Sequence, residues 1–167
     1  FLQKNRIPLE SVMAKSWNKK IFKQIDEQVN KASKDLAEER GACPDAAEYG
    51  YQERFSNKTA IAPTASISII CGGASPGVEP IAANSYTHKT LSGSFNVRNR
   101  YLEEILEGHG KNDDETWSTI TTNQGSVSHL GFLTDLEKDV FKTAFELNQQ
   151  WIIELSGDRT PFISQAQ

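Results

Sequence analysis

An uncharged stretch over residues 59–73 constrains the fold more than any other part of this sequence. It reads Thr59-Ala-Ile-Ala-Pro-Thr-Ala-Ser-Ile-Ser-Ile-Ile-Cys-Gly-Gly73. An apolar run stops at Pro63, small hydroxyl residues then alternate with apolar ones, and a second apolar run ends in two glycines. This order of residues predicts a strand, then a tight turn, then the start of a short helix or strand.

Small side chains in such a turn leave backbone N–H groups open to an anion. The first N–H groups of a helix have no partner within the helix, and the helix dipole favours negative charge there. The segment therefore predicts a phosphate-binding loop. The alternative is a buried strand whose hydroxyl groups bond to backbone. This alternative stays open because short motif matches of this kind have a high false-positive rate.

The composition is that of a soluble globular protein with one domain. The chain has 167 residues, of which 24% are charged and 37% hydrophobic, and its net charge is -4. That charge argues against a nucleic-acid surface, which needs clustered Lys and Arg. No apolar run is long enough to span a membrane, and no secretion signal is visible.

The cysteines and histidines predict neither a disulfide framework nor a metal site. Cys43 and Cys71 do not form a CxxC pair, which favours a reducing, cytoplasmic location. The histidines have no close ligand partners at metal spacing. The apolar tail at residues 161–167 is unlike a natural terminus, so we expect the chain to be a segment of a longer protein.

Periodicity predicts helices around a smaller amount of strand. A long amphipathic helix is expected over residues 9–40, within a helical segment 1–41 that Gly41 ends. Its apolar stripe, which we expect to face a core, is Met13, Trp17, Ile21, Phe22, Ile25, Val29, Ala32 and Leu36. Residues 42–58 read as a polar connector.

The second half of the chain contains clear local signals. A turn-rich loop over 72–80 precedes strand-compatible residues over 86–97, broken at Gly93. Asn99 is a good cap for a short helix that ends at Gly108, and another helix is expected over 114–121, with Asp113, Asp114 and Glu115 at its start. A capping box at Thr134–Glu137 predicts a last helix over 134–157. The fold class is mixed α/β, rich in helix.

With these elements in place, the sequence resembles the C-terminal barrel segment of the catalytic (large, alpha) subunit of ribonucleotide reductase, of the class I type. Four blocks carry the resemblance in the family's order: Ala60-Ile-Ala-Pro-Thr-Ala-Ser-Ile-Ser68, Gly77-Val-Glu-Pro80, Ala83-Asn-Ser-Tyr-Thr-His-Lys-Thr-Leu-Ser-Gly-Ser-Phe95, and the region from Val140-Phe-Lys-Thr-Ala-Phe-Glu146 to Asp158-Arg159 and Phe162-Ile-Ser-Gln-Ala-Gln167.

The resemblance implies a part of the family's ten-stranded α/β barrel over residues 1–167. It also implies a role in ribonucleoside-diphosphate reduction by thiyl-radical chemistry, which supplies deoxyribonucleotides for DNA replication. The implied partners are the diphosphate substrate, the remainder of the large subunit, a metal-containing small subunit that generates the radical, thioredoxin or glutaredoxin, and a second large subunit in a homodimer. Effectors of the whole enzyme would be dNTP and ATP.

At the level of residues, the resemblance places substrate phosphates on one loop. In the family this loop binds chiefly through backbone N–H groups, and it falls here on Pro63, Thr64, Ala65, Ser66 and Ile67. The loop orients the nucleotide and makes no bonds. The family's finger-loop cysteine motif, Asn-x-Cys-x-Glu, has no match in the sequence. We therefore expect no catalytic residue, no metal ligand and no bound cofactor here, and no activity from the isolated segment.

Three alternatives remain open. A cobalamin-dependent class II reductase shares the barrel, often with Gly where Ala65 stands. A stand-alone phosphate-binding or scaffold domain would do no chemistry. A split enzyme would assemble from this chain and a separately encoded half.

Asp158-Arg159 is a candidate ion pair, and the remaining acidic pairs are interpreted as solvated helix faces.

Overall fold

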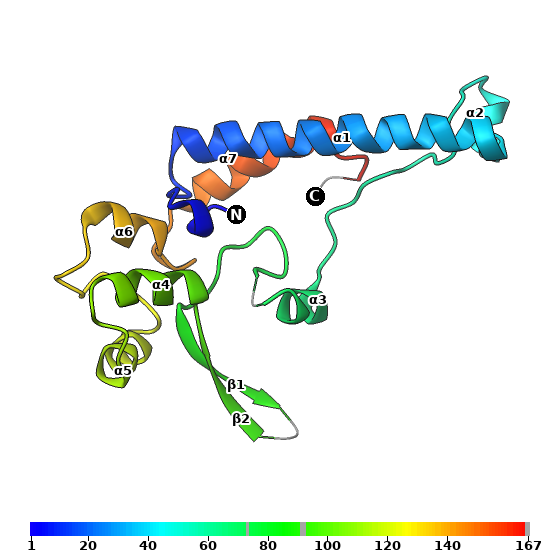
Figure 1. The fold of residues 1–167 in the computed structure, drawn as a ribbon. Coiled ribbons are helices and arrows are strands. Elements are labelled where there is room, and N and C mark those ends of the chain that lie inside the picture. The colour runs from blue at the N-terminus through cyan, green and yellow to red at the C-terminus, as the bar shows by residue number, and fades with distance from the viewer. Residues whose placement is uncertain (73, 91–92, 166–167) are drawn as a thin grey trace. The chain divides into compact units, whose positions relative to one another are not determined.

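A computed structural model describes residues 1–72, 74–90 and 93–165 of the chain (Figure 1). The chain divides into two compact units, of which the first comprises Phe1–Ala14 and Thr64–Trp151 and the second comprises Lys15–Pro63 and Ile152–Gln167. The fold contains more helix than strand, as the sequence predicts. None of the described helices combines the length and apolar character needed to cross a bilayer.

The long helix predicted near the N-terminus is confirmed as α1 (Val12–Arg40). Ser11 starts the helix, because its hydroxyl accepts a 3.1 Å hydrogen bond from the Ala14 N–H. Gly41 ends it with a left-handed backbone at φ 81°. The apolar stripe is less buried than expected, since 59% of Met13 and 40% of Ile25 are exposed. The expectation that this stripe faces a core is therefore wrong within the described residues.

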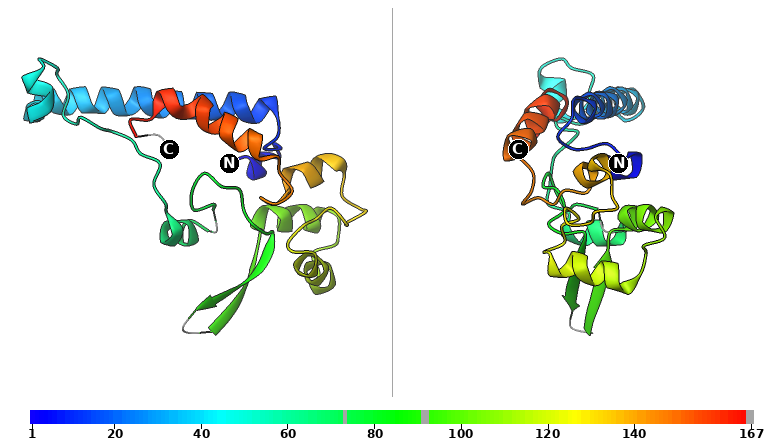
Figure 2. Two further views of the ribbon diagram at one scale, coloured as in Figure 1. Left: turned by 180° about the vertical axis from the view of Figure 1, so that it is seen from behind. Right: turned by 90° about the vertical axis from the view of Figure 1, so that its left-hand side faces the viewer.

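In the second unit, α7 (Gln149–Arg159) lies along α1 (Figure 2). The Asn18 side chain donates a 2.8 Å hydrogen bond to the Leu155 carbonyl, and Lys19 pairs with Asp158 at 3.1 Å. Lys15 pairs with Glu154 one turn earlier. Asp158 thus pairs with a lysine of α1, and the candidate pair with its neighbour Arg159 is not formed. The α1 residues that make these contacts, Lys15, Asn18 and Lys19, are not members of the apolar stripe.

Hydrogen bonds also join the predicted connector, residues 42–58, to α1. The connector contains a short helix, α2 (Pro44–Glu48), that the sequence pattern did not predict. Ser33 is 1% exposed on α1, and its hydroxyl accepts hydrogen bonds from the N–H groups of Arg54 and Phe55. A small hydroxyl residue at this position therefore lets the returning chain lie close to the helix.

The strand predicted within residues 59–73 is reduced to one parallel bridge, between Ala60 and Gln165. The Gln165 N–H donates to the Thr59 carbonyl at 3.0 Å, and the Ile61 N–H donates to the Gln165 carbonyl at 3.3 Å. The strand prediction is wrong beyond this bridge. A strand needs a neighbour along its length, and in the described part of the chain only Gln165 pairs with this segment.

The predicted strands around Gly93 are confirmed as an antiparallel hairpin in the first unit. It pairs β1 (Ser85–Thr90) with β2 (Gly93–Arg98), in register from Ser85↔Arg98 to Thr90↔Gly93. Gly93 begins β2 at φ 139°, a conformation that favours glycine. Residues 91–92, between the strands, lie outside the described residues.

The two short helices after the hairpin match their predicted caps. Asn99 accepts from the Tyr101 N–H and starts α4 (Arg100–Gly108). Asp113 accepts from the Thr116 N–H and starts α5 (Asp114–Thr122). The acidic residues at positions 113–115 therefore serve a helix start, as expected.

The single helix predicted over 134–157 is wrong. The capping box at Thr134 and Glu137 is present, but α6 (Asp135–Val140) ends after six residues and α7 starts only at Gln149. Between them the Ala144 N–H donates to the Ile81 carbonyl at 2.9 Å, which an uninterrupted helix could not allow. Tertiary hydrogen bonding has overridden the helical pattern.

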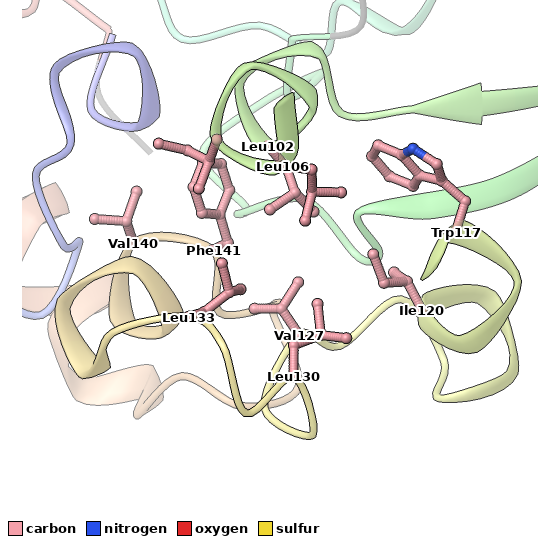
Figure 3. Close-up of a cluster of buried hydrophobic side chains, with 10 residues drawn as sticks. Leu102, Leu106, Trp117, Ile120, Val127, Leu130, Leu133, Val140 and Phe141 are labelled. Carbon is pink, nitrogen blue, oxygen red and sulfur yellow. The ribbon is translucent and has the colours of Figure 1, made fainter. Parts of the chain in front are cut away.

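The core of the first unit lies among α4, α5, α6 and the segments that join them (Figure 3). Trp117 and Ile120 point from α5 toward Leu102 and Leu106 of α4, and Phe141 approaches from the end of α6. The buried cluster comprises Leu102, Ile105, Leu106, Trp117, Ile120, Val127, Leu130, Leu133, Val140 and Phe141.

Candidate phosphate-binding loop

The candidate loop lies at the start of a short helix, α3 (Ala65–Ile70), which is the helix outcome of the sequence prediction. Ala65, Ser66 and Ile67 are exposed. Their N–H groups donate no hydrogen bond to any described residue. The first N–H group of the helix that finds a helical acceptor is that of Ser68. Three adjacent backbone donors on exposed residues at this end of α3 therefore have no hydrogen-bond partner among the described residues, and we call them the open amides.

Thr64 precedes the helix but does not cap it. Its N–H and its hydroxyl both donate to the Pro76 carbonyl, each at 2.8 Å. Its backbone at φ -128° and ψ 42° lies outside the helical region, and its side chain makes no cap hydrogen bond. Thr64 therefore binds the turn-rich loop, and the amides at the helix start are left without a side-chain acceptor.

The other two hydroxyl residues of the loop have different environments. Ser68 is 8% exposed, and its hydroxyl donates to the Ala65 carbonyl at 2.7 Å. Its N–H donates to the Thr64 carbonyl at 2.8 Å and forms the first helical bond. Ser66 is exposed and forms no hydrogen bond with a described residue. Thr64 and Ser68 thus bond to backbone, as the alternative interpretation of the sequence expects, but on a helix.

Four of the five predicted residues lie together in the first unit. Thr64, Ala65, Ser66 and Ile67 form one continuous helix start. Pro63 is exposed and is the last residue of the preceding segment of the second unit. Proline has no N–H to donate, so its contribution is restricted to backbone shape.

The loop is electrically neutral in its own sequence. No charged residue occurs between Lys58 and Glu79. The Arg100 guanidinium lies beside Gly72, past the other end of α3, where a Cβ on the glycine would sit 3.0 Å from Nη1. Neutral N–H donors of this kind can hold an anion but cannot act as an acid, a base or a nucleophile.

Side chains capable of other chemistry are sparse in this region. Cys71 is an exposed free thiol after the last residue of α3, and Cys43 is a free thiol of the second unit. The isoleucines that precede Cys71 are exposed. Among the described residues, no group of three or more His, Cys, Asp or Glu side chains is placed to hold a metal ion.

Sequence reasoning missed the acceptor that positions the loop. The Pro76 carbonyl lies twelve residues from Thr64 and receives both of its donors. The available signal was the density of Gly and Pro over residues 72–80, which indicated turns but did not indicate which carbonyl would point back toward α3.

Comparison with known proteins identifies the family to which the chain is similar. The family model described as "Ribonucleotide reductase, barrel domain" matches residues 45–167. The ribonucleoside-diphosphate reductase large subunit of Invertebrate iridescent virus 3 is 43% identical over all of this chain, which covers 27% of that protein. The large subunit of Invertebrate iridescent virus 6 is 44% identical, again over the whole chain, which covers 18% of it.

A solved structure is similar over almost the full chain. The class Id ribonucleotide reductase alpha subunit of Actinobacillus ureae is 39% identical, with a TM-score of 0.89 over 99% of this chain and 30% of that subunit. Its class agrees with the class I interpretation of the sequence. The chain spans less than a third of each of these relatives. From the matched residues and this structural likeness, the chain belongs to the ribonucleotide reductase family and forms part of its barrel domain.

Proposed function

We propose that this chain is the part of a ribonucleoside-diphosphate reductase large subunit that binds the substrate's phosphates. The diphosphate would accept hydrogen bonds from the N–H groups of Ala65, Ser66 and Ile67, and the Ser66 hydroxyl would add a fourth. Pro63 and Thr64 would shape the approach to these donors. The segment would orient the nucleotide and would take no part in making or breaking bonds.

The observation that carries the proposal is the set of three open amides at the start of α3. Hydrogen bonds from N–H groups to an anion are shorter and stronger than those between neutral groups. The side chains at positions 64–67 are uncharged, so nothing ionised competes with the phosphate. The names of the relatives supply the substrate class, a ribonucleoside diphosphate.

The chemistry of reduction would belong to other parts of the assembly. The whole enzyme would use a thiyl radical in the remainder of the large subunit, a metal-containing small subunit that generates the radical, and thioredoxin or glutaredoxin as the source of electrons. A homodimer of large subunits regulated by dNTP and ATP, working in the cytoplasm, completes the proposal. No residue of this chain is assigned to these steps.

The substitution Ser66→Asp in the complete enzyme tests the phosphate assignment. Two unit charges about 4 Å apart interact by about 4 kcal/mol at an effective dielectric of about 20. A carboxylate at this position should therefore weaken diphosphate binding by at least about tenfold, which is about 1.4 kcal/mol. Equilibrium binding of a ribonucleoside diphosphate measures the effect, and the radical content of the small subunit should be unchanged.

Two further variants make the test specific. Ser66→Ala keeps all the backbone donors, so binding should weaken only slightly. Ser118→Asp places the same charge on an exposed serine of α5 and should leave binding unchanged. Unaltered diphosphate affinity in Ser66→Asp would remove the phosphate assignment, whereas equal losses in both aspartate variants would indicate a general effect of charge.

The scaffold alternative predicts a different result. A stand-alone domain of residues 1–167 would show a cooperative thermal transition and would bind a nucleoside diphosphate by itself. The phosphate-binding proposal predicts that this segment alone is poorly soluble, because part of a barrel leaves strand edges unpaired.

A further inference from the structure

The turn-rich loop that holds Thr64 also carries a carboxylate. Glu79 is exposed, and it is the first charged residue after Lys58 in the sequence. A Cβ on Gly77 would sit 2.5 Å from Glu79 Oε2, so the carboxylate lies directly over this glycine. Among the described residues, no lysine, arginine or histidine pairs with Glu79. Its negative charge is therefore not neutralised within the described part of the chain.

Local contacts determine the position of Glu79 in the loop. The Ser75 hydroxyl donates a hydrogen bond to the Glu79 carbonyl, which closes the turn over residues 75–79. Gly77 has no side chain, and this leaves the space that the carboxylate occupies. Pro80 follows in the sequence and disfavours a helical backbone at the residue before it. The carboxylate is therefore folded back over its own loop.

Two contacts connect this carboxylate to the candidate phosphate-binding loop. Pro76, the neighbour of Gly77, accepts from both the N–H and the hydroxyl of Thr64. The open amides begin at the next residue, Ala65. With standard bond lengths, these contacts place Glu79 Oε2 no more than about 13 Å from the Ala65 nitrogen. Charges at this separation interact through water at low salt, where the Debye length is about 30 Å.

A negative charge beside an anion site penalises additional negative charge on the ligand. The open amides can bind phosphate, but each further phosphate group adds charge that the Glu79 carboxylate repels. Specificity arises from such repulsion of the wrong ligand as well as from contacts with the right one. We infer that Glu79 is a specificity-determining residue that favours a ribonucleoside diphosphate over a triphosphate, an inference that rests on the proposed function.

The substitution Glu79→Gln in the complete large subunit tests this role, because it keeps the size of the side chain and removes its charge. The probes are labelled cytidine diphosphate, whose Kd is measured directly, and cytidine triphosphate, whose Kd is measured by displacement of the diphosphate. The ratio of the triphosphate Kd to the diphosphate Kd should fall at least about threefold at about 0.01 M salt. The fall should be smaller at about 0.15 M salt, because salt screens exposed charges.

Two control variants make the result specific to the charge of Glu79. Glu79→Asp keeps the carboxylate and should keep most of the parent ratio. Glu104→Gln removes an exposed carboxylate from α4 and should leave the ratio unchanged. An unchanged ratio in Glu79→Gln, an equal fall in Glu104→Gln, or a loss of affinity for both nucleotides in Glu79→Gln would overturn the inference.

The result can be separated from the test of the phosphate proposal. Ser66→Asp asks whether the loop binds phosphate at all, and it should weaken the binding of both nucleotides. If Ser66→Asp weakens binding while Glu79→Gln leaves the ratio unchanged, the phosphate site is retained and the role of Glu79 is rejected. If Ser66→Asp has no effect on either nucleotide, the phosphate site is rejected and the role of Glu79 with it.

Discussion

The side-chain amide of Asn84 donates a 2.7 Å hydrogen bond to the backbone carbonyl of Phe141. The same amide donates to the Gly125 carbonyl at 2.9 Å, and the Asn84 side-chain oxygen accepts from Asn99 at 2.8 Å. Asn84 is 1% exposed, so these bonds lie in the interior. One asparagine therefore joins the start of the hairpin, the turn after α5 and the end of α6.

Replacing Asn84 by Ala should destabilise the first unit. The Phe141 carbonyl would lose its donor, whereas the Gly125 carbonyl keeps the bond from the Asn84 backbone N–H. One buried polar group left unsatisfied costs about 1–3 kcal/mol. Native-state hydrogen exchange of the Gly125 and Phe141 amides in the complete large subunit should show a local opening free energy lower by about 1–3 kcal/mol. The control is Asn96→Ala, at an exposed asparagine of β2, which should change exchange very little. Equal effects of the two variants would refute the role given to Asn84.

Gly125 packs against the residue before Asn84 and tolerates no side chain. Its backbone has φ 79°, and a Cβ there would lie 2.3 Å from the Ala83 Cβ and 2.8 Å from the Asn84 nitrogen. Gly125→Ala should therefore lower the melting temperature of the subunit clearly, because the backbone must move.

The matched control is Gly110→Ala. Gly110 has a similar φ of 65°, but a Cβ on this glycine would meet nothing within 4 Å. The substitution should cost only the left-handed strain of about 1–2 kcal/mol. If both alanine variants melt at the same temperature, the contact with Ala83 contributes nothing beyond backbone conformation.

Local signals in the sequence predicted the elements whose ends are set locally. Asn99 and Asp113 bond to amides two or three residues away, so the starts of α4 and α5 could be read directly. The alternating residues on both sides of Gly93 likewise predicted the hairpin. In each case the deciding contact lies within a few residues of the pattern.

The failures have their cause in contacts between distant residues. The interruption between α6 and α7 depends on the Ile81 carbonyl, which accepts from the Ala144 N–H. Nothing near Ala144 in the sequence signals that acceptor. Small side chains within residues 59–73 predicted a phosphate-binding loop, and the resemblance to the family assigned that loop to positions 63–67. The open amides, by contrast, depend on Pro76, which binds Thr64 and is separated from it by twelve residues.

The carboxylate of Glu146 should make the interruption between α6 and α7 sensitive to acid. Burial raises the pKa of Glu146, but hydrogen bonds from Ser126 and from the Thr143 N–H and hydroxyl outweigh it and leave the pKa below its ordinary value. Folding therefore favours the charged form. The contribution is complete above the unfolded-state pKa of about 4.3 and is lost as the pH falls through the lower folded-state pKa.

Glu146→Gln removes this titration and should flatten the dependence of stability on pH below about 4.3. Melting temperatures of the variant and the parent subunit, compared from neutral pH downward, measure the difference. Glu104→Gln makes the same change on the exposed side of α4 and should leave the fall of the melting temperature at acid pH as in the parent. If the melting temperature of Glu146→Gln falls at acid pH as steeply as that of the parent, the carboxylate does not hold this segment through its charge.

The bond from the Thr64 hydroxyl to the Pro76 carbonyl should matter for substrate affinity more than for turnover. Thr64→Val keeps the shape and the N–H bond but removes the hydroxyl bond, and one such bond contributes about 0.5–1.5 kcal/mol. If this bond positions the amides of α3, the KM for a ribonucleoside diphosphate should rise about threefold to tenfold with kcat unchanged, since only uniform binding is lost.

Thr64→Ser restores the hydroxyl and should restore the KM. Thr122→Val removes an exposed hydroxyl from α5 and should have no effect. A normal KM in Thr64→Val, together with weak binding in Ser66→Asp, would retain the phosphate site and reject the positioning role of Thr64.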